Sequence, residues 1–487
     1  MGFAEPDNWM YYSAAIQYST YFPLLPLHIP LLHSGFPSHN VMSEGFLLIW
    51  QIVILHFLLN ISIYYAMLLL PLIYFCLGAI LIYLVAKELT NSNFALFAVL
   101  LFAILPAVLI RTSSFEYRGE SFVPILILLF IYLYYKFIPL FNINNTTNII
   151  ILTLLFFIIL MMWNGALYFL AVLIFFFILL LLFYFFQNIK ITIFLGILLS
   201  LLLFIIAIKY FPIGYLSINN SYSLNIAEMQ IPTILTIFAN YNFLFFLAPL
   251  AFIIPNYNKY NYKKKHLILF LFSLYLITIW LVFSAQRWAI LGAIPTILLS
   301  VIVLFNIKEK INLANIKIGN IFIYIFIVFI IISLLLFDII IFISSKPTAE
   351  LDSYYLFLNW IKNNTPKNAT FLTLWQDGSA IEGYANRSSY TDSVFGMNVI
   401  RMNEFAKFLF AKAGNFTYLN QIKPNYLIVR EYWWNFTNGI AQEANLNLSN
   451  INLTQTNFYC LTKGKCVDKS LYNYSNNILY NVSTLTK

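Results

Sequence analysis

Long apolar runs dominate the first 344 residues of the chain, and they are interrupted by short polar segments. A membrane-spanning helix needs about 17–25 predominantly apolar residues. Stretches of that length lie at 63–86, 93–111, 121–140, 148–163, 166–187, 191–211, 233–254, 267–284, 288–306 and 319–343. The stretch 45–60 is shorter and carries Gln51 and His56, so it predicts a helix at the membrane interface.

The pattern changes at Ser344, after which the apolar runs are short and Asn, Thr, Tyr and Gly are frequent. The sequence therefore predicts two domains. Residues 1–344 form a transmembrane domain with about ten spans, and residues 345–487 form one soluble domain.

Composition agrees with an integral membrane protein. Of the 487 residues, 61% are hydrophobic and only 9% are charged, whereas roughly a quarter of the residues of a soluble domain are charged. In a membrane protein, the positions of the basic residues behind the net charge of +9 report which loops face the cytoplasm. We therefore expect no nucleic-acid partner.

Basic residues are concentrated in alternate loops between the predicted spans, and such loops face the cytoplasm. They are Lys87, Lys136, Lys190, Lys259, Lys263, Lys264, Lys265, Lys308, Lys310 and Lys317. The opposite loops and the soluble domain are then extracytoplasmic, and the protein is a multi-pass cell-membrane protein.

Asn-x-Ser/Thr sequons agree with an outward-facing glycoprotein, although an Asn-rich sequence also generates sequons by chance. After residue 344 they begin at Asn363, Asn368, Asn386, Asn415, Asn435, Asn447, Asn452, Asn473 and Asn481. Cys460 and Cys466 flank LTKGK in the same region. They could pair in an oxidising compartment, but spacing alone leaves the pairing open.

Three outward loops carry carboxylates beside the membrane, namely Glu5 with Asp7, Glu116 with Glu120, and Glu228 in an apolar setting. An unpaired carboxylate in such a place is costly. One interpretation is an ion pair with Arg111, Arg118 or Lys209. The other is that the loops meet and bind a hard divalent cation, because Mg²⁺ and Mn²⁺ prefer oxygen ligands.

These loops carry motifs in a recognisable order. Glu5-Pro6-Asp7-Asn8-Trp9 comes first, and Arg111-Thr112 then precedes Glu120. The run Asn225–Gln230 contains Glu228. Trp375-Gln376-Asp377-Gly378 follows in the soluble domain, with Asn386-Arg387 and Asp392 after it.

In this order, the motifs resemble the catalytic subunit of oligosaccharyltransferase in its archaeal single-subunit form. The resemblance covers most of the chain, including Arg287 in Ser284-Ala285-Gln286-Arg287. It implies an α-helical polytopic membrane protein with the C-type glycosyltransferase fold and a C-terminal mixed α/β soluble domain.

The chain departs from the family pattern in several places. Arg118 occupies a position that is usually acidic, so Glu116 is an alternative second ligand. The Trp-Gln-Asp-Gly signature lacks its second aromatic residue, and the segment 430–440 offers only Glu431 for the motif expected there. The family also has a transmembrane helix before its first acidic loop, whereas Asp7 is the seventh residue here.

The resemblance implies transfer of a lipid-linked oligosaccharide, of the dolichyl phosphate or diphosphate type, to the Asn of Asn-x-Ser/Thr in acceptor polypeptides, by a single subunit. Asp7 and Glu228 would engage the acceptor amide, and Arg287 the lipid phosphate. Asp7 and Glu120, or Glu116, would hold Mn²⁺ or Mg²⁺.

The same resemblance implies that Trp375, Gln376, Asp377 and Gly378 form the pocket that binds the sequon. A plain alternative is that Trp375–Gly378 is a strand followed by a tight Asp-Gly turn.

Three other functions remain open. A lipid-phosphate-dependent mannosyl- or glucosyltransferase would share the first acidic loop but needs no sequon pocket. A transporter should show polar residues or broken helices at mid-membrane. A structural glycoprotein explains the sequons but not Glu228.

Overall fold

A computed structural model gives the fold of the chain. It describes residues 6–23, 28–29, 39–40, 46–112, 117–137, 146–210, 231–255, 257–313, 317–344, 349–391, 395–431, 433, 437, 440–441, 446, 448–463, 472–474 and 477–485.

The chain folds into two compact units. The bundle unit consists of residues 44–48 and 68–345, and the sheet unit consists of residues 1–43, 49–67 and 346–487. Segments from the N-terminus therefore group with the C-terminal region, which sequence order did not suggest. The domain bounds 1–344 and 345–487 remain a prediction.

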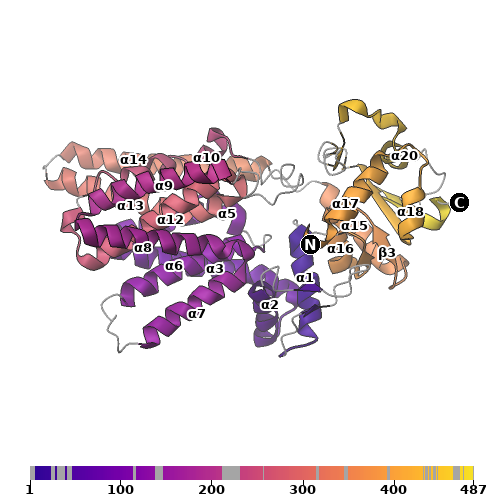
Figure 1. Ribbon diagram of the computed structural model, residues 1–487, viewed down its shortest axis with the longest axis horizontal. Helices are drawn as coiled ribbons and strands as arrows, with labels where there is room; N and C mark the ends of the chain where they lie inside the picture. Colours follow the sequence, from indigo (N-terminus) through magenta and orange to yellow (C-terminus); the bar gives the residue numbers. More distant parts are fainter. Residues whose placement is uncertain are drawn as a thin grey trace. The chain divides into compact units, whose positions relative to one another are not determined.

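The bundle unit is helical (Figure 1). Its helices, of which α3 begins in the sheet unit, are α3 (Ile63–Leu89), α4 (Ser92–Ile104), α5 (Pro106–Thr112), α6 (Gly119–Phe137), α7 (Thr146–Met162), α8 (Tyr168–Phe186), α9 (Ile189–Tyr210), α10 (Ile234–Tyr241), α11 (Leu244–Leu250), α12 (Tyr262–Ser284), α13 (Ala289–Leu313) and α14 (Lys317–Ser344). Each of the ten predicted apolar stretches contains a helix. The stretch 45–60 is also helical, as α2 (Phe46–Leu59), and its position at the membrane interface remains a prediction.

The protein is a multi-pass membrane protein. Within the described ranges, six helical segments are long and apolar enough to cross a membrane. They are Ile63–Leu89, Gly119–Phe137, Gly165–Phe186, Tyr262–Ser284, Ala289–Asn312 and Ile321–Ile339. Ten crossings remain a prediction.

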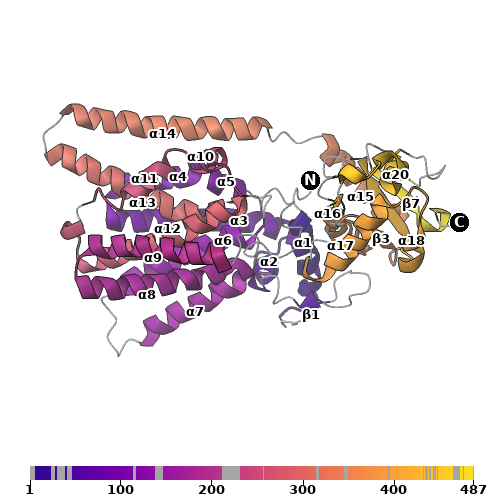
Figure 2. The same cartoon turned by 45° about the horizontal axis from the view of Figure 1, so that its top comes forward.

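Helix α8 shows why this unit belongs in lipid. Phe169, Val172, Phe176 and Phe183 on one face are buried, and they pack on neighbours such as α9 and α12, of which α9 lies beside α8 in Figure 2. The other face is also apolar, and Phe185 is 80% exposed there. A helix that is apolar all round is stable only when both faces contact apolar surroundings.

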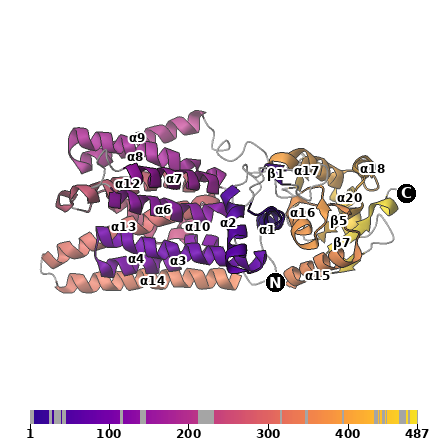
Figure 3. The ribbon, with the colours of Figure 1, turned by 90° about the horizontal axis from the view of Figure 1, so that it is seen from below.

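Two predicted spans are each divided into two helices. Leu105 is extended, with φ −78° and ψ 121°, because the ring of Pro106 excludes the helical conformation at the preceding residue. Asn242 has a positive φ of 53° and ends α10. Neither 93–111 nor 233–254 is therefore one continuous helix. The last helix of the bundle unit is α14, which runs beside α4 (Figure 3).

The sheet unit contains one mixed sheet of five strands in the order β4-β3-β5-β7-β6. The strands are β3 (Thr370–Leu372), β4 (Ser388–Ser389), β5 (Tyr426–Arg430), β6 (Tyr472–Tyr474) and β7 (Asn477–Asn481). Strand β3 runs parallel to β4 and β5, and β7 runs antiparallel to β5 and β6. The pairing is in register with Phe371 opposite Tyr426 and Leu427 opposite Tyr480.

The same unit contains short helices, which carry the candidate site. They are α1 (Pro6–Ser19), α15 (Ala349–Asn364), α16 (Trp375–Ala380), the π-helical turn η8 (Ile381–Ala385), α17 (Phe395–Phe410), α18 (Thr417–Ile422), α20 (Asn457–Thr462) and α21 (Val482–Leu485). The core between them is apolar and includes Leu372, Phe405, Leu427, Trp433 and Phe458. A separate two-stranded ladder joins β1 (His28–Ile29) to β2 (His39–Asn40). The predicted mixed α/β domain is confirmed.

Candidate functional site

Asp377 is the centre of a buried polar cluster in the sheet unit. Its side chain is only 4% exposed. Its Oδ1 atom lies 2.7 Å from Nη1 of Arg430, and its Oδ2 atom accepts a 3.0 Å hydrogen bond from the indole nitrogen of Trp433. Hydrogen bonds between two ionised groups are among the strongest in proteins, so these contacts fix the carboxylate.

The sheet topology explains why these residues meet. Asp377 lies in α16, which directly follows β3, and Arg430 is the last residue of β5. Because β3 and β5 are parallel neighbours, their carboxyl ends lie at the same sheet edge. Residues 53 positions apart in the sequence are thereby brought into contact.

Tyr354 completes the cluster from α15. The guanidinium carbon of Arg430 lies 4.2 Å from the centroid of the Tyr354 ring, a distance that permits a cation–π interaction. Burial, and secondly the negative charge of Asp377, raise the pKa of the Tyr354 hydroxyl well above its ordinary value. The hydroxyl therefore stays neutral at physiological pH.

Gly378 lets α16 pack directly on the chain after β4. A Cβ atom at this position would lie 1.7 Å from the carbonyl oxygen of Thr391. Trp375 and Gln376 are half-buried at the start of the same helix. The alternative interpretation of 375–378 as a strand and turn is wrong, because these residues are helical.

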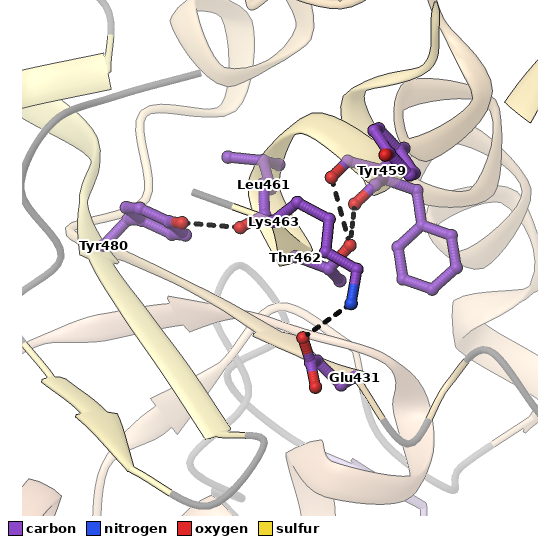
Figure 4. A network of polar contacts seen from close by, with 7 residues as sticks. Glu431, Tyr459, Leu461, Thr462, Lys463 and Tyr480 are labelled. Carbon is purple, nitrogen blue, oxygen red and sulfur yellow. Dashed lines mark hydrogen bonds and ion pairs between the residues drawn. The ribbon is translucent and has the colours of Figure 1, made fainter. Parts of the chain in front are cut away.

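The segment 430–440 does reach the signature residues, but not through the residue expected from the sequence. Arg430 and Trp433 contact Asp377. Glu431 instead pairs with Lys463, with 3.1 Å between Oε1 and Nζ (Figure 4), and surface ion pairs of this kind contribute about 0–1 kcal/mol. Sequence reasoning therefore missed Arg430, Trp433 and Tyr354. The signal for Arg430 and Trp433 was the arginine and the two tryptophans in REYWW, whereas the sequence around Tyr354 carried none.

Helix α1 packs on the π-helical turn that follows α16. Trp9 is 4% exposed, and its ring meets Tyr384 edge-to-face at 5.5 Å between centroids. A Cβ atom on Gly383 would lie 2.7 Å from the carbonyl oxygen of Trp9. Glycine is therefore needed for this close approach. The packing also borders a cavity of about 330 Å³.

Of the predicted metal ligands, only the side chain of Glu120 is described. It lies in the first turn of α6, and its side chain is 3% exposed, with Oε1 3.5 Å from Nη1 of Arg118. Arg118, at the position that is usually acidic, thus contributes a positive charge beside Glu120. Of the two interpretations of the outward-facing acids, this contact agrees with the ion pair for Glu120.

The other predicted acids of the outward loops, and Arg287, have side chains outside the described ones. Asp7 lies in α1 and Arg287 in the short helix η7 (Gln286–Trp288), but their side chains lie outside the described ones. Glu5, Glu116, Glu228 and Asp392 lie outside the described residues altogether.

A divalent cation fits the chemistry of this donor set, because Asp7, Glu116 and Glu120 supply only carboxylate oxygens. Among the residues that the structure describes, no group of three His, Cys, Asp or Glu side chains comes together. Metal binding therefore remains a prediction.

Cys460 is disulfide-bonded, whereas Cys76 has a free thiol and Cys466 lies outside the described residues. Within the described residues, the sequon asparagines Asn363, Asn368, Asn386, Asn415 and Asn452 are exposed.

No protein-family model matches the chain, and no curated protein matches it. Solved structures do. The oligosaccharyltransferase of Archaeoglobus fulgidus, tethered through a disulfide to an acceptor peptide with the NVT sequon, has a TM-score of 0.71 and 14% identity. The match covers 97% of this chain and 76% of that one.

Two further structures have the same architecture. The A. fulgidus oligosaccharyltransferase AglB with an inhibitory peptide and a dolichol-phosphate has a TM-score of 0.68 at 14% identity, covering 91% of this chain and 68% of that one. ArnT from Cupriavidus metallidurans, bound to undecaprenyl phosphate, has a TM-score of 0.52 at 8% identity, covering 99% and 95%. The chain has the C-type glycosyltransferase fold of these membrane enzymes, as the sequence resemblance implied.

Proposed function

We propose that this chain, which has the fold of AglB, transfers an oligosaccharide from a lipid phosphate or diphosphate carrier to the asparagine of Asn-x-Ser/Thr. The observation that carries the proposal is the likeness to the peptide-tethered oligosaccharyltransferase over 97% of the chain. The four sequence motifs, found in the order of that family, support it.

The cluster around Asp377 supports a role in recognising the hydroxyl of the acceptor Ser or Thr. A carboxylate offers about four acceptor positions, and Arg430 and Trp433 each occupy one. The remaining capacity allows Asp377 to accept a hydrogen bond from the acceptor hydroxyl, with Trp375 packing beside it. Because the carboxylate is already fixed, little ordering is needed when the hydroxyl binds.

The chemical difficulty of the reaction is that an amide nitrogen is a poor nucleophile. In this proposal, Asp7 and Glu228 accept hydrogen bonds from the acceptor amide, which reduces its resonance and exposes the nitrogen for attack. Attack opposite the leaving group inverts the configuration at the sugar carbon. Arg287 complements the charge of the lipid phosphate.

Asp7 and Glu120, with Glu116 as the alternative to Glu120, would hold Mn²⁺ or Mg²⁺. When bound, such an ion stabilises a phosphate leaving group as a Lewis acid. The active site and the soluble domain are extracytoplasmic in this proposal, and the enzyme acts as a single subunit.

The likeness to ArnT supports a second candidate, in which a single sugar is transferred from a lipid phosphate to an acceptor other than a sequon. Acceptor discrimination separates the two candidates. Membranes containing the chain receive native lipid-linked glycan and either an Asn-x-Thr or an Asn-x-Ala peptide. We expect glycopeptide only from the Asn-x-Thr peptide. A site built to hydrogen-bond a hydroxyl discriminates by about 10⁴-fold against an analogue that lacks it.

Two variants sharpen this assay. Asp377→Ala should mainly weaken peptide capture, because Asp377 binds the residue two positions after the acceptor. Glu404→Ala, an exposed acid in the same unit, is the matched control and should leave capture unchanged. Equal use of both peptides by the unmodified chain would refute the proposed function, whereas unchanged Thr preference in Asp377→Ala would refute the role of Asp377 in binding the hydroxyl.

A further inference from the structure

The described residues that line the cavity beside the π-helical turn η8 are different from those assigned to the proposed reaction. The cavity has a volume of about 330 Å³, at the lower end of the roughly 300–1,000 Å³ typical of small-molecule sites. Its lining comes from α1, α3, α15 and η8, and includes Trp9, Tyr12, Gln17, Lys362, Glu382 and Tyr384.

The aromatic side of the cavity is rigidly held. Trp9 meets Tyr384 at an interplanar angle of 89° and Tyr12 at 87°, with centroid distances of 5.5 and 5.8 Å. Edge-to-face pairs at such distances are favourable. The glycine at 383 sets the depth of α1 against η8, since Cβ would meet the carbonyl of Trp9. The π-helical turn itself is a rare conformation that often marks functional sites.

The polar rim is also held in place. The buried guanidinium of Arg387 donates to the carbonyl oxygens of Lys362 and Asn386 at 2.7 and 3.0 Å. Both of those residues line the cavity, so one side chain fixes two parts of its rim. The ammonium of Lys362 lies 5.6 Å from the centroid of the Tyr384 ring.

The lining favours one class of ligand. Half-buried aromatic rings such as those of Tyr12 and Tyr384 suit the apolar C–H face of a pyranose ring. The amide and hydroxyl groups of Gln17, Asn386 and Ser13 can both donate to and accept from sugar hydroxyls, and the carboxylate of Glu382 can accept from them. The ammonium of Lys362 and the carboxylate of Glu382 have opposite charges. A neutral sugar is therefore favoured over an acidic or cationic one.

We infer that this cavity is a saccharide-binding site that holds a neutral pyranose residue. The inference rests on the proposed function, because the donor and the product of that reaction are the molecules that carry the sugar. The sugar can belong to the glycan on the lipid carrier or to a glycan already attached to protein, because both present the same ring and hydroxyls.

Binding is tested on the detergent-solubilised full chain, without acceptor peptide or added metal. The probe is the neutral oligosaccharide released by mild acid from the lipid-linked glycan of the source membranes, and saturation-transfer NMR with titration gives its Kd. We expect Tyr384→Ala and Gln17→Ala each to weaken binding about tenfold or more. Gln421→Ala, an exposed glutamine elsewhere in the unit, is the control and should bind normally.

Gln17→Ala removes a half-buried helical side chain and keeps the test decisive if Tyr384→Ala does not fold. Displacement of the probe by a glycopeptide identifies a protein-attached glycan as a ligand, and displacement by the lipid-linked glycan identifies the donor. The inference is overturned if the probe does not bind, if both variants bind it normally, or if an unglycosylated Asn-x-Thr peptide displaces it.

A transfer assay on the same preparation separates the two proposals. Sugar binding without any transfer to peptide would refute the proposed function and leave the saccharide site standing. Transfer without sugar binding would refute the saccharide site and leave the proposed function standing.

Discussion

The guanidinium of Arg430 and the carboxylate of Asp377 form a buried ion pair, with 2.7 Å between Nη1 and Oδ1. The two side chains are 12% and 4% exposed. Removing one partner of a buried pair leaves a charge without compensation, whereas replacing both by apolar groups is often tolerated. This asymmetry allows the pair to be tested separately from catalysis.

Arg430→Met should destabilise the sheet unit by about 3–5 kcal/mol, because it strands the Asp377 carboxylate. The double variant Arg430→Met with Asp377→Leu should recover much of that loss. Thermal unfolding of the solubilised full chain measures both. Additive losses in the double variant would show that the two residues do not act as a pair.

The same variants separate stability from recognition. The double variant should regain stability yet lose the preference for Asn-x-Thr over Asn-x-Ala peptides, because no carboxylate remains to accept the hydroxyl. If the stable double variant still discriminated between the peptides, the hydroxyl pocket would have to lie elsewhere.

Gly378→Ala should abolish peptide capture and lower the unfolding temperature. The added Cβ would lie 1.7 Å from the carbonyl oxygen of Thr391, which is backbone, so α16 or the chain after β4 must move. Gly414→Asn is a suitable control. A Cβ at Gly414 has no neighbour within 4 Å, and Asn tolerates the left-handed conformation better than most residues. Normal capture by Gly378→Ala would contradict the tight packing of α16.

Chelation should stop transfer, and added Mn²⁺ or Mg²⁺ should restore it. Asp7→Ala and Glu228→Ala should each lose most of the rate at saturating peptide while the protein remains folded. Transfer that continues in metal-free buffer would contradict the proposed requirement for a divalent cation.

Glu120→Ala and Glu116→Ala decide which acid fills the second metal position. We expect Glu120→Ala to raise the Mn²⁺ concentration needed for half-maximal activity. If instead Glu120→Ala were silent and Glu116→Ala inactive, then Glu120 would serve only as the partner of Arg118.

The orientation of the sheet unit is tested by protease protection in oriented vesicles. The positive-inside rule predicts that residues 345–487 lie outside, so these residues should be cut in right-side-out vesicles and protected in inverted ones. The opposite result would end the proposed scheme, because acceptor and active site would lie on different sides of the membrane.

The sequence by itself determined that the chain is a helical membrane protein with a mixed soluble region. Lipid cannot hydrogen-bond to the backbone, so each span must be a long apolar helix, and that requirement is visible in local composition. The helices α2, α3, α8 and α12 could therefore be predicted from the sequence. The Trp375–Gly378 motif was readable as a signature, although its helical conformation was not.

Only the tertiary structure decided which residues surround that motif. Arg430 and Trp433 reach Asp377 because β3 and β5 are parallel neighbours, and α1 reaches η8 because position 383 lacks a side chain. Local periodicity records which face of an element is apolar, but it does not record which distant element will cover that face. The partner of a buried charge is fixed by strand order and packing, and these are properties of the folded chain alone.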